Sequence, residues 1–145
     1  MDRRIGAWHQ FLQASTQVLE ALETELQAER GLSLSFYEVL LRLHHAPEGR
    51  MRMQELAGGV LLSKSGLTRL VDRMQQEGLV ERRSCPTDRR GVEAVITERG
   101  RARLREAAPV HLRGIREHFT DHLTDEESDV LARALGRVVS AFEEA

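Results

Sequence analysis

The most constraining feature of the chain is the stretch from Glu55 to Gly100, in which the hydrophobic pattern changes from helical to strand-like. Two short helical patterns come first, and the second, over residues 64–76, has apolar residues on one face and polar or basic residues on the other. Two strand-like runs follow, Val80–Arg83 and Glu93–Ile96, joined by a basic turn. This order predicts a helix-turn-helix followed by a two-stranded hairpin, the wing of a winged helix.

The charge distribution separates this middle region from the two ends. The whole chain of 145 residues has a formal net charge of −2, but residues 50–105 hold thirteen Lys or Arg against seven Asp or Glu. The remaining residues hold eight basic and sixteen acidic side chains. A basic middle between acidic ends is the pattern expected when only the middle meets phosphate groups. Together with the winged-helix pattern, it predicts a DNA-binding regulator.

Long amphipathic helices are expected on both sides of the winged helix. Apolar residues recur in steps of three and four from Ile5 to Leu26, and Ser35 with Glu38 has the spacing of a capping box that would start the next helix. Residues 51–53 are expected to add a third short strand, and residues 54–60 a short helix before the one at 64–76. Gly78 is expected to cap that second helix.

After the hairpin, Thr97 is expected to cap a basic helix that continues to about Leu123. Pro109 lies within it and should kink or interrupt it, because proline removes a backbone donor and clashes one turn back. Thr124 and Glu127 form another capping box, which should open a last amphipathic helix.

The fold class expected is mostly α with a small β wing. We expect residues 35–105 to form the winged helix-turn-helix domain, and residues 1–34 and 106–145 to form a helical dimerisation region, because the outer helices have more apolar surface than the winged domain can cover. The chain has no apolar run of the length a membrane span needs and opens without a secretory signal pattern. A lone cysteine, Cys85, fits a reducing compartment. These features predict a cytoplasmic protein with no membrane partner.

The candidate DNA contacts lie on one helix and in the wing. Short hydroxyls and long cations on the exposed side of helix 64–76 suit contacts with bases and phosphates, and an arginine at a hairpin tip suits a narrow minor groove. Arg82 and Arg83 precede the Pro86-Thr87-Asp88 turn. The DNA-binding residues predicted are Lys64, Ser65, Thr68, Arg69, Arg73, Asp88, Arg89 and Arg90. Asp88 is expected to pair one neighbouring arginine and thereby orient the other; either Arg89 or Arg90 enters the groove.

The run LSKSGLTRLVDRMQQEGLVERR, followed by DRRG and then ITERG, resembles the MarR family of bacterial transcriptional regulators. The specific match covers roughly residues 50–105. The resemblance implies a homodimer in which each winged helix contacts half of a pseudo-palindromic operator, and a repressor that releases DNA when a small molecule binds. The family's recognition-helix positions correspond here to Ser65, Thr68 and Arg69, and its wing-tip pair to Asp88 and Arg90.

An effector site is expected from the same resemblance, because many relatives bind aromatic carboxylates or phenols between the dimerisation region and the winged domain. The candidate ligand-binding residues are Trp8, Leu12, Tyr37 and His44, and the alternative is that Trp8 and Tyr37 only pack in the core or dimer interface. A second alternative is a zinc-responsive regulator of the same fold, because His118 and His122 have the spacing of a chelating pair and His111 lies one heptad earlier. A third is a regulator without an effector.

An enzyme is not expected, and neither is a cofactor. Gly58-Gly59 lacks the lysine and hydroxyl of a phosphate-binding loop, and neither the G-x-S-x-G nor the H-E-x-x-H pattern occurs. Cys85 lies beside arginines, which can lower a thiol pKa, but the favoured interpretation is a thiol without a chemical role. A winged fold that binds protein instead of DNA remains a separate hypothesis, which a salt-dependent DNA shift would separate from the first.

Overall fold

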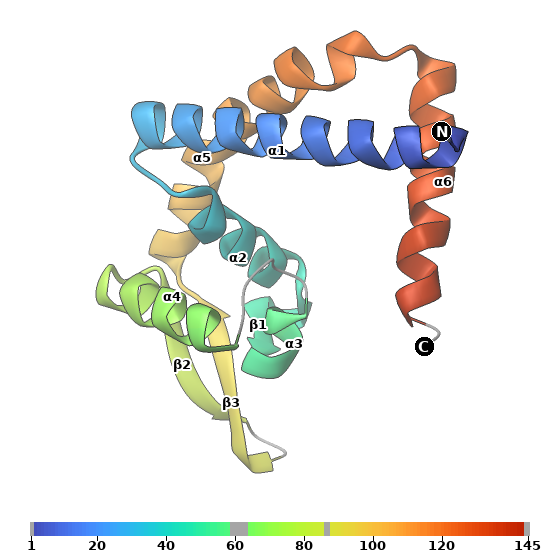
Figure 1. Cartoon of the computed structure of the whole chain (residues 1–145). Coiled ribbons are helices and arrows are strands. Elements are labelled where there is room, and N and C mark those ends of the chain that lie inside the picture. The colour runs from blue at the N-terminus through green and yellow to red at the C-terminus, as the bar shows by residue number, and fades with distance from the viewer. Residues whose placement is uncertain (1, 59–63, 86–87, 144–145) are drawn as a thin grey trace. The chain divides into compact units, whose positions relative to one another are not determined.

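The computed structural model describes residues 2–58, 64–85 and 88–143, and for residues 64–65 and 88–90 it describes the backbone alone. The chain divides into two compact units (Figure 1). One unit comprises residues 23–111, and the other joins residues 1–22 to residues 112–145. The fold is mostly α-helical with a small antiparallel sheet, as the sequence predicts. The domain boundaries at residues 34/35 and 105/106 stay a prediction.

Helices dominate both units. They are α1 (Arg3–Arg30), α2 (Leu34–His45), α3 (Met53–Ala57), α4 (Lys64–Gln76), α5 (Glu98–His118) and α6 (Asp125–Glu143), with short 3-10 helices η1 (Pro47–Gly49) and η2 (Thr120–His122). Among the described residues, no helix is both long enough and apolar enough to cross a membrane.

The wing is part of a three-stranded antiparallel sheet. Its strands are β1 (Arg50–Arg52), β2 (Val80–Cys85) and β3 (Asp88–Ile96), in the order β1-β3-β2. Arg50 pairs with Val95, and Val80 pairs with Ile96, so β3 lies between the other two strands. The third strand expected near Met51 is confirmed. The bounds expected for the hairpin strands, Val80–Arg83 and Glu93–Ile96, are too short. Strand β2 extends to Cys85 and β3 begins at Asp88, with an irregularity in the pairing after Ser84.

The core of the 23–111 unit is built from buried apolar side chains of α2, α4, the sheet and α5. The apolar face predicted for α4 is confirmed, because its four members are at most 3% exposed: Leu67, Leu70, Val71 and Met74. Gly78 ends this segment with φ of +77°, and the Leu79 amide donates to the Met74 carbonyl. That backbone conformation favours glycine, which explains why the expected cap is observed.

Two expected helix ends need correction. Helix α2 begins at Leu34, and the hydroxyl of Ser33 accepts a hydrogen bond from the Phe36 amide, 3.1 Å away. The capping box expected at Ser35 and Glu38 is therefore wrong, because Ser33 has the extended backbone of an N-cap and places Ser35 inside the helix.

Helix α5 also differs from its expected course. It continues through Pro109 without interruption, with Ala107 and Val110 buried on either side, so burial outweighs the lost backbone hydrogen bond. It ends at His118 instead of about Leu123, and η2 follows. The expected cap at Thr97 is confirmed: its hydroxyl accepts from the Gly100 amide.

The capping box that opens α6 is confirmed. The Thr124 amide donates to the Glu127 carboxylate at 2.9 Å, and the Glu127 amide donates to the Thr124 hydroxyl at 3.1 Å. This reciprocal pair of bonds satisfies two backbone donors that the helix start leaves without partners.

Candidate nucleic-acid interface

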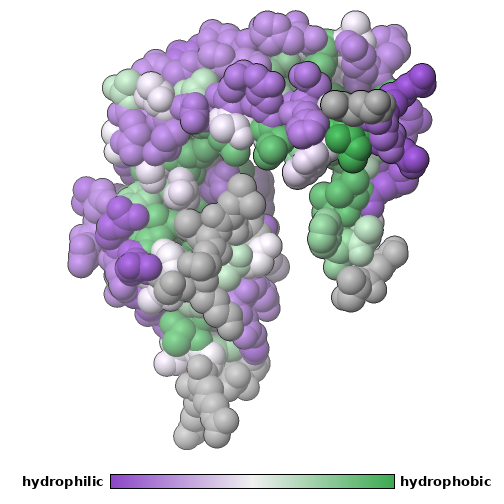
Figure 2. Space-filling model, in the orientation of Figure 1, coloured by the Kyte–Doolittle hydropathy of each residue, from purple (hydrophilic) through white to green (hydrophobic). Residues whose placement is uncertain are grey.

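Helix α4 exposes a polar and basic face opposite its buried face. Thr68, Arg69, Asp72 and Arg73 are all exposed, as the sequence predicts from the helical period. Figure 2 shows hydrophilic side chains on the outer part of α4, next to hydrophobic ones. Lys64 and Ser65 belong to the first turn of α4, but their side chains lie outside the described residues.

Arg82 of β2 is hydrogen-bonded to three residues on one side of α4. Its Nη1 donates to the Asp72 carboxylate and, at 3.2 Å, to Oε1 of Gln75, and its Nη2 donates to the Thr68 carbonyl oxygen at 2.9 Å. The Arg82 side chain is only 25% exposed. The sequence places Arg82 beside Arg83 before the wing turn and does not by itself reveal this contact with α4. The alternation of side chains along β2 could have indicated that Arg82 points toward the helices, because Arg82 lies on the same face of the sheet as the buried Val80.

A second arginine of α4 packs on a different neighbour. The guanidinium carbon of Arg73 lies 5.6 Å from the centroid of the Phe36 ring, and Phe36 is 7% exposed. The cation therefore stands over an aromatic face on α2, within the range of a cation–π interaction. This contact restricts the stem of Arg73 while the residue stays exposed on α4.

The wing extends beyond the helices of the 23–111 unit (Figure 1). Its outer part carries Arg83, which pairs with Glu81 on the same strand at 2.9 Å, and Val92, which is 42% exposed. Asp88, Arg89 and Arg90 form the start of β3, so the backbone places them at the distal end of the hairpin. Their side chains, and residues 86–87 of the turn, lie outside the described residues. Cys85, at the end of β2, is buried.

At the opposite edge of the sheet, an ion pair joins β1 to β3. Nη1 of Arg50 lies 3.5 Å from Oε2 of Glu93, and Glu93 is 8% exposed. A buried carboxylate requires such a partner, since an isolated charge in a core is costly. The pair therefore fixes the base of the wing to the segment that leads into α3.

The four candidate ligand residues have different surroundings. On α1, Trp8 is 53% exposed and Leu12 is 46% exposed. Tyr37 is buried in the 23–111 unit, where its ring centroid lies 4.4 Å from that of His111 and burial raises the pKa of its phenol. His44 is exposed, and its Nδ1 lies 2.8 Å from Nη1 of Arg101. Tyr37 and His44 thus each have a packing or polar partner within their own unit.

His118 and His122 do not lie on one continuous helix, although the sequence gives them the spacing of a chelating pair. Helix α5 ends at His118, and His122 belongs to η2, where its Nε2 lies 3.1 Å from the Glu117 carbonyl oxygen. The i, i+4 spacing brings two imidazoles together only on a continuous helix, and the chain leaves the helix between them.

Comparison with known proteins places these features in a family. The MarR family model matches residues 32–92. The crystal structure of AbsC, a MarR family transcriptional regulator from Streptomyces coelicolor, is 36% identical, with a TM-score of 0.89 over 100% of this chain and 97% of AbsC. The chain belongs to the MarR family.

Two further transcriptional regulators are similar to this chain. Sco3205, a MarR family transcriptional regulator from Streptomyces coelicolor solved in complex with DNA, is 31% identical, with a TM-score of 0.89 over 97% of this chain and 89% of Sco3205. The transcriptional repressor YetL of Bacillus subtilis is 33% identical over 75% of this chain, and the match spans 65% of YetL. Family membership confirms the expected class, a MarR-type transcriptional regulator with a winged-helix DNA-binding fold and not an enzyme.

Proposed function

We propose that this protein binds a pseudo-palindromic DNA operator as a homodimer and represses transcription. The observation that carries the proposal is the exposed face of α4, which presents Thr68, Arg69 and Arg73 beside a β hairpin. A helix of this kind fits the major groove, and the hairpin tip then reaches the adjacent backbone or minor groove. The related Sco3205 was solved in complex with DNA, which supports DNA binding by this protein.

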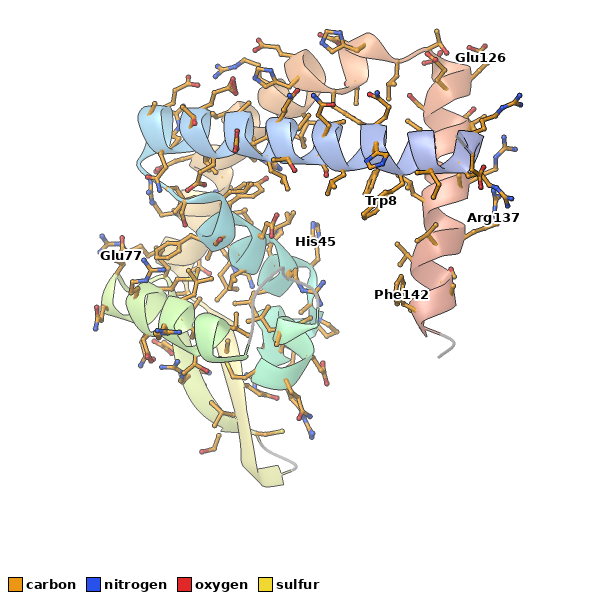
Figure 3. The ribbon with its side chains drawn as sticks, viewed as in Figure 1. Trp8, His45, Glu77, Glu126, Arg137 and Phe142 are labelled. Carbon is orange, nitrogen blue, oxygen red and sulfur yellow. The ribbon has the colours of Figure 1, made fainter. Side chains whose placement is uncertain are left out.

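The homodimer is proposed from the apolar surface of the unit that contains α6. Four apolar side chains of α6 are more than half exposed: Val130, Val138, Val139 and Phe142. Figure 2 displays this hydrophobic surface along α6, and Figure 3 displays Trp8 and Phe142 projecting from α1 and α6. An exposed apolar surface of this extent is unfavourable in water and is suited to cover by a second copy.

The dimer can be tested by placing carboxylates on that surface. Val138→Asp combined with Phe142→Asp should convert the dimer to a monomer in sedimentation equilibrium. Ser140→Asp is the matched control, because by the helical period Ser140 lies on the other side of α6 and is exposed. A wild-type protein that sediments as a monomer at micromolar concentration would contradict the proposal.

We also propose that a small planar aromatic or phenolic ligand releases the DNA. The support is the half-exposed indole of Trp8, whose ring centroid lies 6.2 Å from that of Phe11. Such a pair offers an apolar surface on which a planar ligand can stack. The alternatives are release by zinc and a regulator without an effector.

One experiment tests operator binding and its release. Duplexes are selected from a random-sequence library with the full-length protein, the selected duplex is footprinted, and its affinity is measured against salt. We expect two half-sites about one helical turn apart and a steep loss of affinity with salt. Salicylate, urate and Zn²⁺ are then added separately to identify the class of effector. Binding that is absent, or insensitive to salt, would overturn the proposal.

A further inference from the structure

Arg82 makes three hydrogen bonds to α4 although it belongs to the wing. Its acceptors are the Thr68 carbonyl oxygen, the Asp72 carboxylate and the Gln75 side-chain oxygen. These residues succeed one another along a single side of α4, over about two turns of the helix. We call this set of bonds the Arg82 bridge.

The geometry of the bridge restrains how α4 is set against the wing. A guanidinium group is planar and directs its donors in fixed directions, so three acceptors around it define the rotation and the position of the helix that carries them. Arg69 and Arg73 follow Thr68 and Asp72 directly in the sequence. A rotation of α4 would therefore move both arginines relative to the hairpin.

We propose that Arg82 is a positioning residue for DNA recognition: it sets α4 so that Arg69 and its neighbours meet the bases while the wing meets the same duplex. The inference rests on the proposed DNA-binding function. A helix and a hairpin that contact one duplex at two places must keep a fixed mutual geometry, because displacements of about 1 Å remove hydrogen bonds to base edges.

The charges make this proposal distinguishable from simple attraction to phosphate. Arg82 is 25% exposed and paired, whereas Asp72 is 50% exposed on the face proposed to contact DNA. If charge alone mattered, Asp72→Asn would tighten binding to every duplex, since it removes an anion. If the Arg82 bridge positions α4, Asp72→Asn lowers the ratio of operator affinity to random-duplex affinity.

The experiment measures that ratio for Asp72→Asn and for four further variants, at a temperature where circular dichroism finds each one folded. Arg82→Lys keeps the charge but replaces the planar fork with one ammonium group; we expect its random-duplex affinity to stay within about twofold and its ratio to fall by about tenfold. The double variant Arg82→Gln with Asp72→Asn keeps the net charge of the wild type. Its ratio of operator affinity to random-duplex affinity should fall as far as that of Arg82→Gln alone. Arg83→Gln is the control: it removes the same charge from the neighbouring residue and should lower both affinities alike.

A second measurement does not depend on DNA. In the free protein, Arg82→Lys should speed hydrogen exchange at the amides of α4, while Arg83→Gln should not. An unchanged ratio in Arg82→Lys and Arg82→Gln, or a wild-type ratio in the charge-neutral double variant, would overturn the proposal. Unchanged exchange in α4 would also overturn it. If the wild-type protein binds no selected duplex, the proposed function itself is wrong, and the positioning role falls with it.

Discussion

The guanidinium of Arg73 stands over the ring of Phe36, 5.6 Å from its centroid, so an arginine on the exposed face of α4 is supported by a buried aromatic side chain of α2. A partly exposed cation–π contact contributes about 0.5–1 kcal/mol. This contact also limits the conformations from which Arg73 can approach a phosphate group.

A double-mutant cycle should measure this contact. Phe36→Leu keeps the site apolar but removes the ring face, and Arg73→Ala removes the cation. We expect a coupling free energy of about 0.5–1 kcal/mol in urea unfolding of the wild type, the two single variants and the double variant. Additive effects of the two substitutions would mean that the ring does not support Arg73.

Arg69 is expected to contact a base edge. Arg69→Ala should cost about 1–3 kcal/mol of operator binding per half-site and relax specificity at one base step, because a bidentate arginine–guanine pair is lost. The measurement is the affinity of a set of operators that differ at single base pairs. Gln76→Ala, at the exposed end of α4, is the control. Undiminished discrimination in Arg69→Ala would remove Arg69 from base recognition.

Arg90 is expected to act through charge at the wing. Arg90→Ala should weaken binding to operator and random duplexes and make the salt dependence of the affinity shallower by about one phosphate contact per half-site. Arg105→Ala removes the same charge from an exposed position on α5 and is the comparison. If Arg90→Ala and Arg105→Ala change the salt dependence of the affinity equally, the effect is one of net charge and not of a contact made by Arg90.

His111 should make stability depend on pH. Its ring packs on Tyr37, its Nδ1 is buried without a hydrogen-bond partner among the described residues, and burial lowers the pKa of its imidazole below the ordinary value of 6.5. Below pH 6.5 the unfolded chain therefore binds a proton more readily than the folded chain. The free energy of unfolding should fall as the pH decreases from about 6.5 toward the lowered pKa of folded His111.

The corresponding measurement is urea unfolding from pH 7.5 to 5.0 at one protein concentration. His111→Phe keeps an aromatic ring beside Tyr37 and cannot titrate, so its stability should fall less with decreasing pH than that of the wild type. His45→Gln replaces an exposed histidine and is the matched control. If the free energy of unfolding falls equally with decreasing pH in the wild type and in His111→Phe, His111 is not the cause of the pH dependence.

Gly100 should not tolerate a side chain. A Cβ atom there would overlap the Leu79 carbonyl oxygen and lie 2.9 Å from Cγ1 of Ile96, where α5 begins against the base of the wing. Gly100→Ala should destabilise the fold by about 1–3 kcal/mol in urea unfolding. Gly6→Ala, where nothing lies within 4 Å, should instead stabilise α1 by up to about 1 kcal/mol. Equal stabilities of the two variants would contradict this prediction.

Local patterns in the sequence determined the elements of the winged helix. The apolar face of α4, including Val71 and Met74, follows from the helical period, because burial selects residues that recur on one side. The caps at Gly78 and at the capping box of Thr124 with Glu127 were likewise predicted from the spacing of neighbouring residues. In each case the groups that interact lie within one or two turns of one another in the chain.

The tertiary structure alone decided the features that depend on distant segments. The continuation of α5 through Pro109, between the buried Ala107 and Val110, was set by packing that outweighs local preference. The partners of Arg82 lie seven to fourteen positions away on another element. Strand alternation gives the face of Arg82, but only the docking of β2 against α4 gives its acceptors. Periodicity encodes which side of an element is buried, whereas the contacts across elements depend on the register in which they pack.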